Sequence, residues 1–213
     1  MTSASPGTRR HQAGPTVGDR RRARMLDALH RLLETRTFAS ISVADIAGAA
    51  DVTRQAFYFY FPTKAAAVAE LLGDIYEDIF RVAPWFDLRD GDSLAQLRAG
   101  IDTSIVRWRA KAELMVGMLD AVGSDPEVRA IWTGWVRRFE ERTAARISSD
   151  RHRGDARTEV DAPTLACVLV GAIFQAMERD VRAIHAGEAP SPHLSATLFE
   201  VWRRAVYLDV PQL

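Results

Sequence analysis

The side chains with the most distinctive chemistry lie close together, between residues 42 and 64. Arg54 and Gln55 are neighbours there, and a guanidinium group pairs well with guanine while an amide pairs well with adenine. Hydroxyl and ammonium groups suit phosphate oxygens, and a ring can contact a thymine methyl group. We therefore interpret the stretch as a surface that binds double-stranded DNA. Its candidate contacts are Ser42, Thr53, Arg54, Gln55, Ala56, Tyr58, Phe59, Tyr60 and Lys64.

Two short helices must hold these side chains. Ser42 can cap the first helix, and Asp45 then lies in the first turn, where a negative charge is favoured. Asp51 follows at the turn, because aspartate tolerates left-handed backbone better than most residues do. Thr53 can cap a second helix, which Pro62 ends because proline lacks a backbone donor. The pattern is typical of a helix-turn-helix, whose second helix enters the major groove.

The distribution of charge agrees with this interpretation, although the chain has a formal net charge of zero. Residues 1–64 hold ten Lys or Arg against five Asp or Glu, whereas the remainder holds eighteen against twenty-three. Arg20 and Arg21 stand where the first helix should begin, after a polar segment over residues 1–18 that we expect to be disordered. The two arginines form either a basic arm on DNA or a solvated helix end, and the sequence leaves both open.

The whole chain is typical of a folded cytoplasmic protein. Its 213 residues are 47% hydrophobic and 26% charged, which favours a substantial core. No apolar run reaches the ~20 residues that a membrane span needs, and no secretory signal is evident. The one cysteine, Cys167, lies in an apolar run and is expected in the core, although a sensor thiol is the alternative.

Beyond residue 64 the apolar residues recur at helical spacing, with no alternating strand pattern. We therefore predict an all-α fold of about nine helices, with a polar, loop-like segment over residues 148–160. The expected division is a tail over 1–18, a three-helix DNA-binding domain over 19–64, and a helical-bundle domain over 65–213 that binds ligand and forms the dimer.

The motif also carries a family resemblance. The run from Val52 to Lys64 resembles the recognition helix of TetR-family transcriptional regulators, and residues 46–50 match the first helix of their motif. The resemblance covers about residues 20–72, and Asp51 departs from it where the family usually has glycine. It implies that Thr53, Tyr58, Tyr60 and Lys64 mostly hold phosphates. It further implies a homodimer on a palindromic operator, acting as a repressor that a small hydrophobic effector releases.

Large aromatic and methionine side chains gather in the second part of the chain. At helical spacing such residues more often form plain core, but TetR-like proteins enclose an effector cavity among these helices. One subgroup of the family has amides where Phe174 and Met177 stand here, so we expect a more apolar cavity. The candidate ligand contacts are Leu97, Ile101, Ser104, Trp108, Met115, Met118, Trp132, Trp135, Phe139, Thr143, Phe174, Met177 and Trp202.

The last two predicted helices, over residues 161–186 and 191–205, are apolar on more than one face, which indicates a central place or a shared interface. The resemblance implies that they form a four-helix bundle in the dimer. Other functions stay open: an activator, a ligand-independent regulator or, more remotely, a helical-bundle carrier or enzyme. No cofactor, metal-ligand cluster or glycine-rich phosphate loop is apparent, which disfavours an enzyme.

Overall fold

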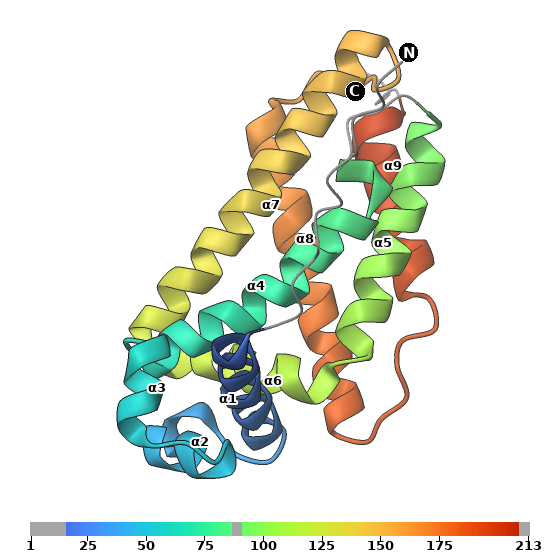
Figure 1. Cartoon of the computed structure of the whole chain (residues 1–213). Coiled ribbons are helices and arrows are strands. Elements are labelled where there is room, and N and C mark those ends of the chain that lie inside the picture. The colour runs from blue at the N-terminus through green and yellow to red at the C-terminus, as the bar shows by residue number, and fades with distance from the viewer. Residues whose placement is uncertain (1–15, 87–90, 209–213) are drawn as a thin grey trace, which may run out of the picture.

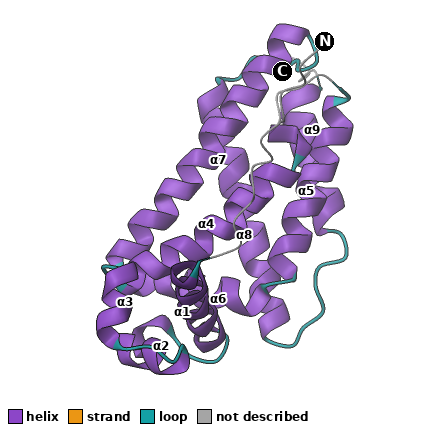
Figure 2. Ribbon diagram, in the orientation of Figure 1, coloured by secondary structure: helices purple, strands orange, loops and turns teal. Residues whose placement is uncertain are grey.

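The computed structural model describes residues 16–86 and 91–208. Within these residues the chain forms nine α-helices, two short 3₁₀ turns and no β-strand, as the all-α prediction requires (Figure 2). None of these helices combines the length and the apolar character needed to cross a membrane. The elements are α1 Val17–Leu33, η1 Phe38–Ser40, α2 Val43–Ala49, α3 Arg54–Tyr60, α4 Lys64–Val82, η2 Pro84–Phe86, α5 Ser93–Arg109, α6 Ala112–Ser124, α7 Pro126–Arg153, α8 Ala162–His185 and α9 Leu194–Tyr207.

α1 begins two residues inside the segment that the sequence predicts as a tail. Thr16 explains the early start, because its side chain accepts a hydrogen bond from the backbone N–H of Asp19 at 3.1 Å. The Asp19 carboxylate in turn accepts one from the Thr16 backbone at 2.8 Å, which completes a capping box. The preceding part of the predicted tail, residues 1–15, lies outside the described residues.

α1, α2 and α3 form a small unit at one end of the molecule (Figure 1). α2 packs against α1 and α3. The core of this three-helix unit is made of side chains that are almost completely buried, among them Leu29, Phe38, Ile46, Phe57 and Phe61. Phe57 and Phe61 are one helical turn apart with ring centroids 5.4 Å apart and planes tilted by 44°, so aromatic packing holds the inner face of α3.

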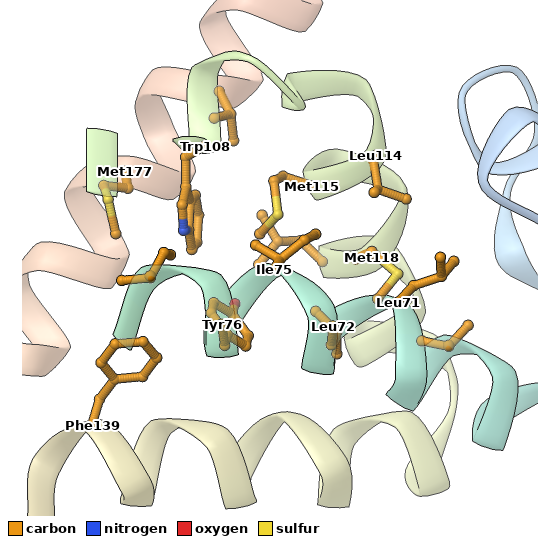
Figure 3. Packing of buried hydrophobic residues seen from close by; sticks show 14 of the residues in the cluster. Leu71, Leu72, Ile75, Tyr76, Trp108, Leu114, Met115, Met118, Phe139 and Met177 are labelled. Carbon is orange, nitrogen blue, oxygen red and sulfur yellow. The ribbon is translucent and has the colours of Figure 1, made fainter. Parts of the chain in front are cut away.

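α4 connects this unit to the rest of the chain. Its first part packs on α1, and it also packs on α5 and α7 of the larger bundle (Figure 1). Figure 3 shows Leu72, Ile75 and Tyr76 of α4 in the core, with Met115 of α6 on one side and Phe139 of α7 on the other. Leu72 and Tyr76 have no exposed surface. α4 therefore contributes to the core of the α1–α3 unit and to the core of the larger bundle.

A buried polar cluster joins α7, η2, α5 and α9. Arg146 and Asp150 have no exposed surface and form an ion pair at 2.7 Å between Nε and Oδ1. The Arg146 guanidinium also donates to the Trp85 carbonyl at 2.9 Å and to the Ser93 hydroxyl at 3.0 Å. The other Asp150 oxygen accepts from the Tyr207 hydroxyl at 2.5 Å. Because these partners satisfy a charge pair that would otherwise be unfavourable in the core, α7 remains helical to Arg153. The predicted loop over 148–160 is thus wrong for its first residues.

α6 touches the α1–α3 unit directly, through a position where only glycine fits. A Cβ atom added to Gly117 would lie 2.8 Å from the backbone carbonyl oxygen of Leu33 at the end of α1. Gly123 lies in the same helix, and a Cβ atom there would meet nothing within 4 Å. The first glycine therefore sets how closely α1 approaches α6, while the second has no such role.

The pair of glycines gives a matched test of this contact. We expect Gly117→Ala to lower the free energy of unfolding by ~1–3 kcal/mol, because the added methyl group must push α1 away from α6. Gly123→Ala should leave stability unchanged or raise it by ~0.5–1 kcal/mol through its helix propensity. Urea unfolding followed by circular dichroism measures both. Equal effects of the two substitutions would contradict the close packing.

Candidate DNA-binding surface and internal cavity

The turn between α2 and α3 positions the predicted recognition helix. Asp51 has φ 54°, and it is the one non-glycine with positive φ among the described residues. The predicted left-handed turn is therefore confirmed. The backbone N–H of Val52 donates to the Ala47 carbonyl at 2.9 Å, which closes the turn. Thr53 then caps α3 by accepting from the Ala56 N–H at 3.1 Å, and Ser42 caps α2 in the same way through Asp45.

The outer face of α3 carries polar and aromatic side chains without burying them. Arg54, Gln55 and Tyr58 are exposed, and Phe59 has 83% of its surface exposed. Ala56 is half-buried between them. So large an exposed aromatic ring is removed from water only if a binding partner covers it. The outer face of α3 therefore has the character of a binding surface.

The start of α1 lies beside the end of α3. The hydroxyl of Tyr60 would be 3.5 Å from a Cβ atom on Gly18, and Tyr60 is half-buried as a result. Arg20 and Arg21 follow immediately and are exposed. Arg22 has a structural role instead, because it forms an ion pair with Glu70 of α4. The structure thus brings the two candidate arginines to the edge of the α3 surface.

Lys64 differs from the other candidates because its charge is already engaged. The ammonium group donates to the backbone carbonyls of Phe38 at 2.6 Å and Ile41 at 2.7 Å, and it lies 3.8 Å from the centre of the Phe38 ring. Burial lowers the pKa of this amine. These contacts tie the start of α4 to the turn before α2. Lys64 therefore has a structural role, which the sequence did not predict beside its phosphate contact.

A cavity lies within the larger bundle, between α4, η2, α5, α7, α8 and α9. Its volume is about 50 Å³. Nine of the predicted ligand contacts line it: Leu97, Ile101, Ser104, Trp108, Phe139, Thr143, Phe174, Met177 and Trp202. The sequence missed its other lining residues, which are Tyr76, Ile79, Trp85, Phe86, Gly100, Val170 and Ile173. Four of these come from α4 and η2.

Four predicted contacts do not line the cavity. Met115 and Met118 are completely buried on α6, where Figure 3 shows them facing the Leu71 to Ile75 part of α4. They fill the core between two helices. Trp132 and Trp135 are half-buried, and they pack on the Tyr76 ring at centroid distances of 6.0 and 5.4 Å. They cover the Tyr76 ring from outside. Helical spacing alone does not distinguish such covering residues from residues that line a cavity.

The outer surface of α8 and α9 exposes several small and apolar side chains. On α8, Val168 has 63% of its surface exposed, and Gly171 and Ala172 beside it are exposed too. Val201 continues this surface type on α9, which packs against α8. Cys167 is exposed on α8, so the expectation that it is a core residue is wrong. The carboxylate of Glu140 raises the pKa of its thiol.

Across residues 16–86 and 91–208, no group of three or more His, Cys, Asp or Glu side chains could hold a metal ion.

Two family models match the sequence. The model for bacterial regulatory proteins of the tetR family matches residues 25–71, from the second half of α1 to the first part of α4. The model for the C-terminal domain of the transcriptional regulator EthR matches residues 97–208.

Known relatives align along most of the chain. The HTH-type transcriptional regulator EthR of Mycolicibacterium smegmatis is 34% identical over 222 aligned positions, covering 99% of this chain and 98% of that protein. EthR of Mycobacterium tuberculosis is 31% identical over 203 positions, covering 93% and 92%. The solved SmeT–triclosan complex shares the fold, with a TM-score of 0.73 at 17% identity over 91% of this chain and 94% of that one. The two relatives are regulators of transcription and not enzymes. The chain described here belongs to the TetR family of bacterial transcriptional regulators and has a C-terminal domain of the EthR type.

Proposed function

We propose that this DNA-binding regulator is a dimeric repressor, which binds a palindromic operator and leaves it when a small apolar ligand enters the bundle. The observation that carries the proposal is the arrangement of α4. Three residues separate this helix from the exposed recognition helix α3, and its Tyr76 and Ile79 form part of the cavity wall. One rigid element therefore links the surface that would meet DNA to the space that would hold the ligand.

On the operator, Arg54 and Gln55 read base edges in the major groove and Phe59 contacts a thymine methyl group. Their exposure on the outer face of α3 supports these roles. Ser42, Thr53, Tyr58 and Tyr60 hold phosphates, and Ala56 lets the helix approach the groove closely. Arg20 and Arg21 add basic contacts at the edge of the surface. Lys64 shapes the motif from inside through its bonds to the turn before α2.

The dimer forms through the outer face of α8 and α9. One helix of seven residues reaches few base pairs, so two copies related by a two-fold axis are needed for affinity and specificity. The exposed Val168, Gly171 and Ala172 allow close approach of a second copy, and the neighbouring Val201 extends the apolar area. No other described part of the chain covers these exposed residues, which supports their use between subunits.

The ligand must enlarge the cavity to enter it. Binding sites for drug-sized molecules occupy ~300–1,000 Å³, whereas this cavity has about 50 Å³. Aromatic side chains from α4, α7 and α8 meet across it, with Tyr76 and Phe174 at a ring distance of 6.2 Å and Phe139 and Phe174 at 5.4 Å. Separating these rings displaces α4, so a ligand that binds the enlarged form weakens operator binding. The triclosan complex of SmeT has the same fold with a small molecule bound.

The first test concerns base reading. We expect Arg54→Ala to weaken binding to the best operator by ~1–3 kcal/mol and to relax preference at one base pair of each half-site. Arg137→Ala, which removes an exposed arginine of α7, is the control and should leave the preference unchanged. Selection of duplexes from a random pool measures the preference. A profile identical to wild type for Arg54→Ala would remove this residue from base reading.

The second test separates the two roles of Lys64. Lys64→Met keeps the aliphatic chain but leaves the Phe38 and Ile41 carbonyls without their donor, so we expect unfolding to become easier by ~1–3 kcal/mol. Urea unfolding in the absence of DNA measures the change. Unchanged stability, combined with a salt dependence of operator binding that is flatter by about one unit, would instead restore the phosphate role.

The third test concerns the dimer. Val168→Asp places a charge on the proposed interface and should convert the dimer to monomer, because two carboxylates would be buried near each other. Val106 on α5 is also 63% exposed, so Val106→Asp is a matched control that should remain dimeric. Sedimentation velocity distinguishes the two. A dimer that survives Val168→Asp would place the interface elsewhere.

A further inference from the structure

The cavity wall carries polar atoms that bond to nothing in the protein. Across the described residues, the completely buried side-chain polar atoms without a hydrogen-bond partner are those of Tyr76, Gln96, Thr143, Arg151 and Trp202. Three of the five line the cavity: the Tyr76 hydroxyl from α4, the Thr143 hydroxyl from α7 and the Trp202 indole N–H from α9. Buried polar groups are nearly always paired, so their concentration around one cavity indicates a binding role.

The chemistry of these groups specifies what would satisfy them. An indole N–H can only donate, so Trp202 requires an acceptor. The two hydroxyl groups can donate as well, and burial raises the Tyr76 pKa far above its usual value, so that group keeps its proton. The third hydroxyl of the wall, that of Ser104, is already satisfied because it donates to the Gly100 carbonyl at 2.9 Å, and the Trp85 indole N–H donates to the Tyr207 hydroxyl. The free groups therefore form a set of donors.

Charge narrows the ligand further. The lining contains no Asp, Glu, Lys, Arg or His side chain, so a charged ligand would be buried without a counter-ion. Arg146 lies behind the Trp85 ring, 5.7 Å from its centre, but its guanidinium is bound to Asp150 and Ser93. Because Asp150 compensates this charge, Arg146 does not serve as a counter-ion for an anionic ligand. A neutral molecule remains, with an apolar body against the aromatic walls.

We propose that the cavity takes a neutral, mainly apolar molecule that carries a hydrogen-bond acceptor, such as a ketone, ester or amide oxygen, and that Trp202, Tyr76 and Thr143 bind this oxygen. The inference rests on the proposed function only in treating the cavity as the ligand site. Because the donors come from α9, α4 and α7, an acceptor among them would link α4 to two helices of the bundle. The polar end of the ligand would thus act directly on the helix that follows the recognition helix.

The test compares octanophenone with octylbenzene, which differ by the carbonyl oxygen. Isothermal titration calorimetry on the full chain should give about tenfold tighter binding of the ketone, the increment expected of a well-placed hydrogen bond. In the double variant Tyr76→Phe, Thr143→Val the preference should fall to about threefold or less, with Trp202 supplying the remainder. Ser104→Ala removes a hydroxyl of the same wall that is already paired, and it should keep the tenfold preference.

The ligand-free variants provide a second measurement. Because both hydroxyl groups lack partners, Tyr76→Phe and Thr143→Val should melt at or above the wild-type temperature. A lower melting temperature of either variant would show that its hydroxyl has a partner and would overturn the inference. Equal binding of the two probes, or binding of neither, would overturn it as well. Operator binding without ligand is measured on the same preparations, so a failure there refutes the repressor proposal and not the acceptor-binding site.

Discussion

The packing of α4 is the constraint on which the rest of the structure depends. Leu72 and Tyr76 are completely buried, and between them they contribute to the core that joins α1, α6 and α7. A close-packed interior does not deform continuously, so a change in the cavity beside Tyr76 must move the helix or be excluded. Gly117 adds a second fixed contact, because the α1 backbone passes too close for any larger residue. Both contacts help to set the orientation of the DNA-binding unit on the bundle.

The far end of the bundle is held in a different way. The buried cluster around Arg146 and Asp150 fixes η2 through the Trp85 carbonyl and fixes α9 through Tyr207. The Trp85 indole N–H donates to the Tyr207 hydroxyl at 2.9 Å, which places its ring against the cavity. Apolar packing therefore holds α4, whereas paired charges hold the opposite wall. A ligand would displace apolar side chains more readily than a satisfied ion pair, so under the proposed mechanism we expect the α4 side to move.

The DNA-binding unit was largely predictable from the sequence because its signals are local. The caps at Ser42 and Thr53, the left-handed turn at Asp51 and the end of α3 before Pro62 each depend on a few neighbouring residues. Lys64 shows the limit of this approach. The family resemblance implied a phosphate contact for it, but the carbonyls that it binds in the structure come from residues more than twenty positions earlier in the chain.

The cavity was predictable only in part because its walls are assembled by tertiary packing. Helical spacing and the family resemblance predicted Phe139, Thr143 and Trp202, which line the cavity. The same reasoning added Met115, which is buried on α6, and Trp132, which packs on the lining ring of Tyr76 without lining the cavity itself. The continuation of α7 through Asp150 was missed for a similar reason. A charged segment resembles a loop unless the buried partners of its charges are known.

The central claim is that occupation of the cavity and binding of the operator oppose each other through α4. Its most direct test is the affinity of the wild-type chain for a selected palindromic duplex, measured at fixed salt with and without a saturating cavity ligand. The account predicts affinity weaker by about 5- to 150-fold with the ligand bound, and ligand affinity weaker by the same factor when the duplex is present. Operator affinity that stays the same at full occupancy of the cavity would contradict it.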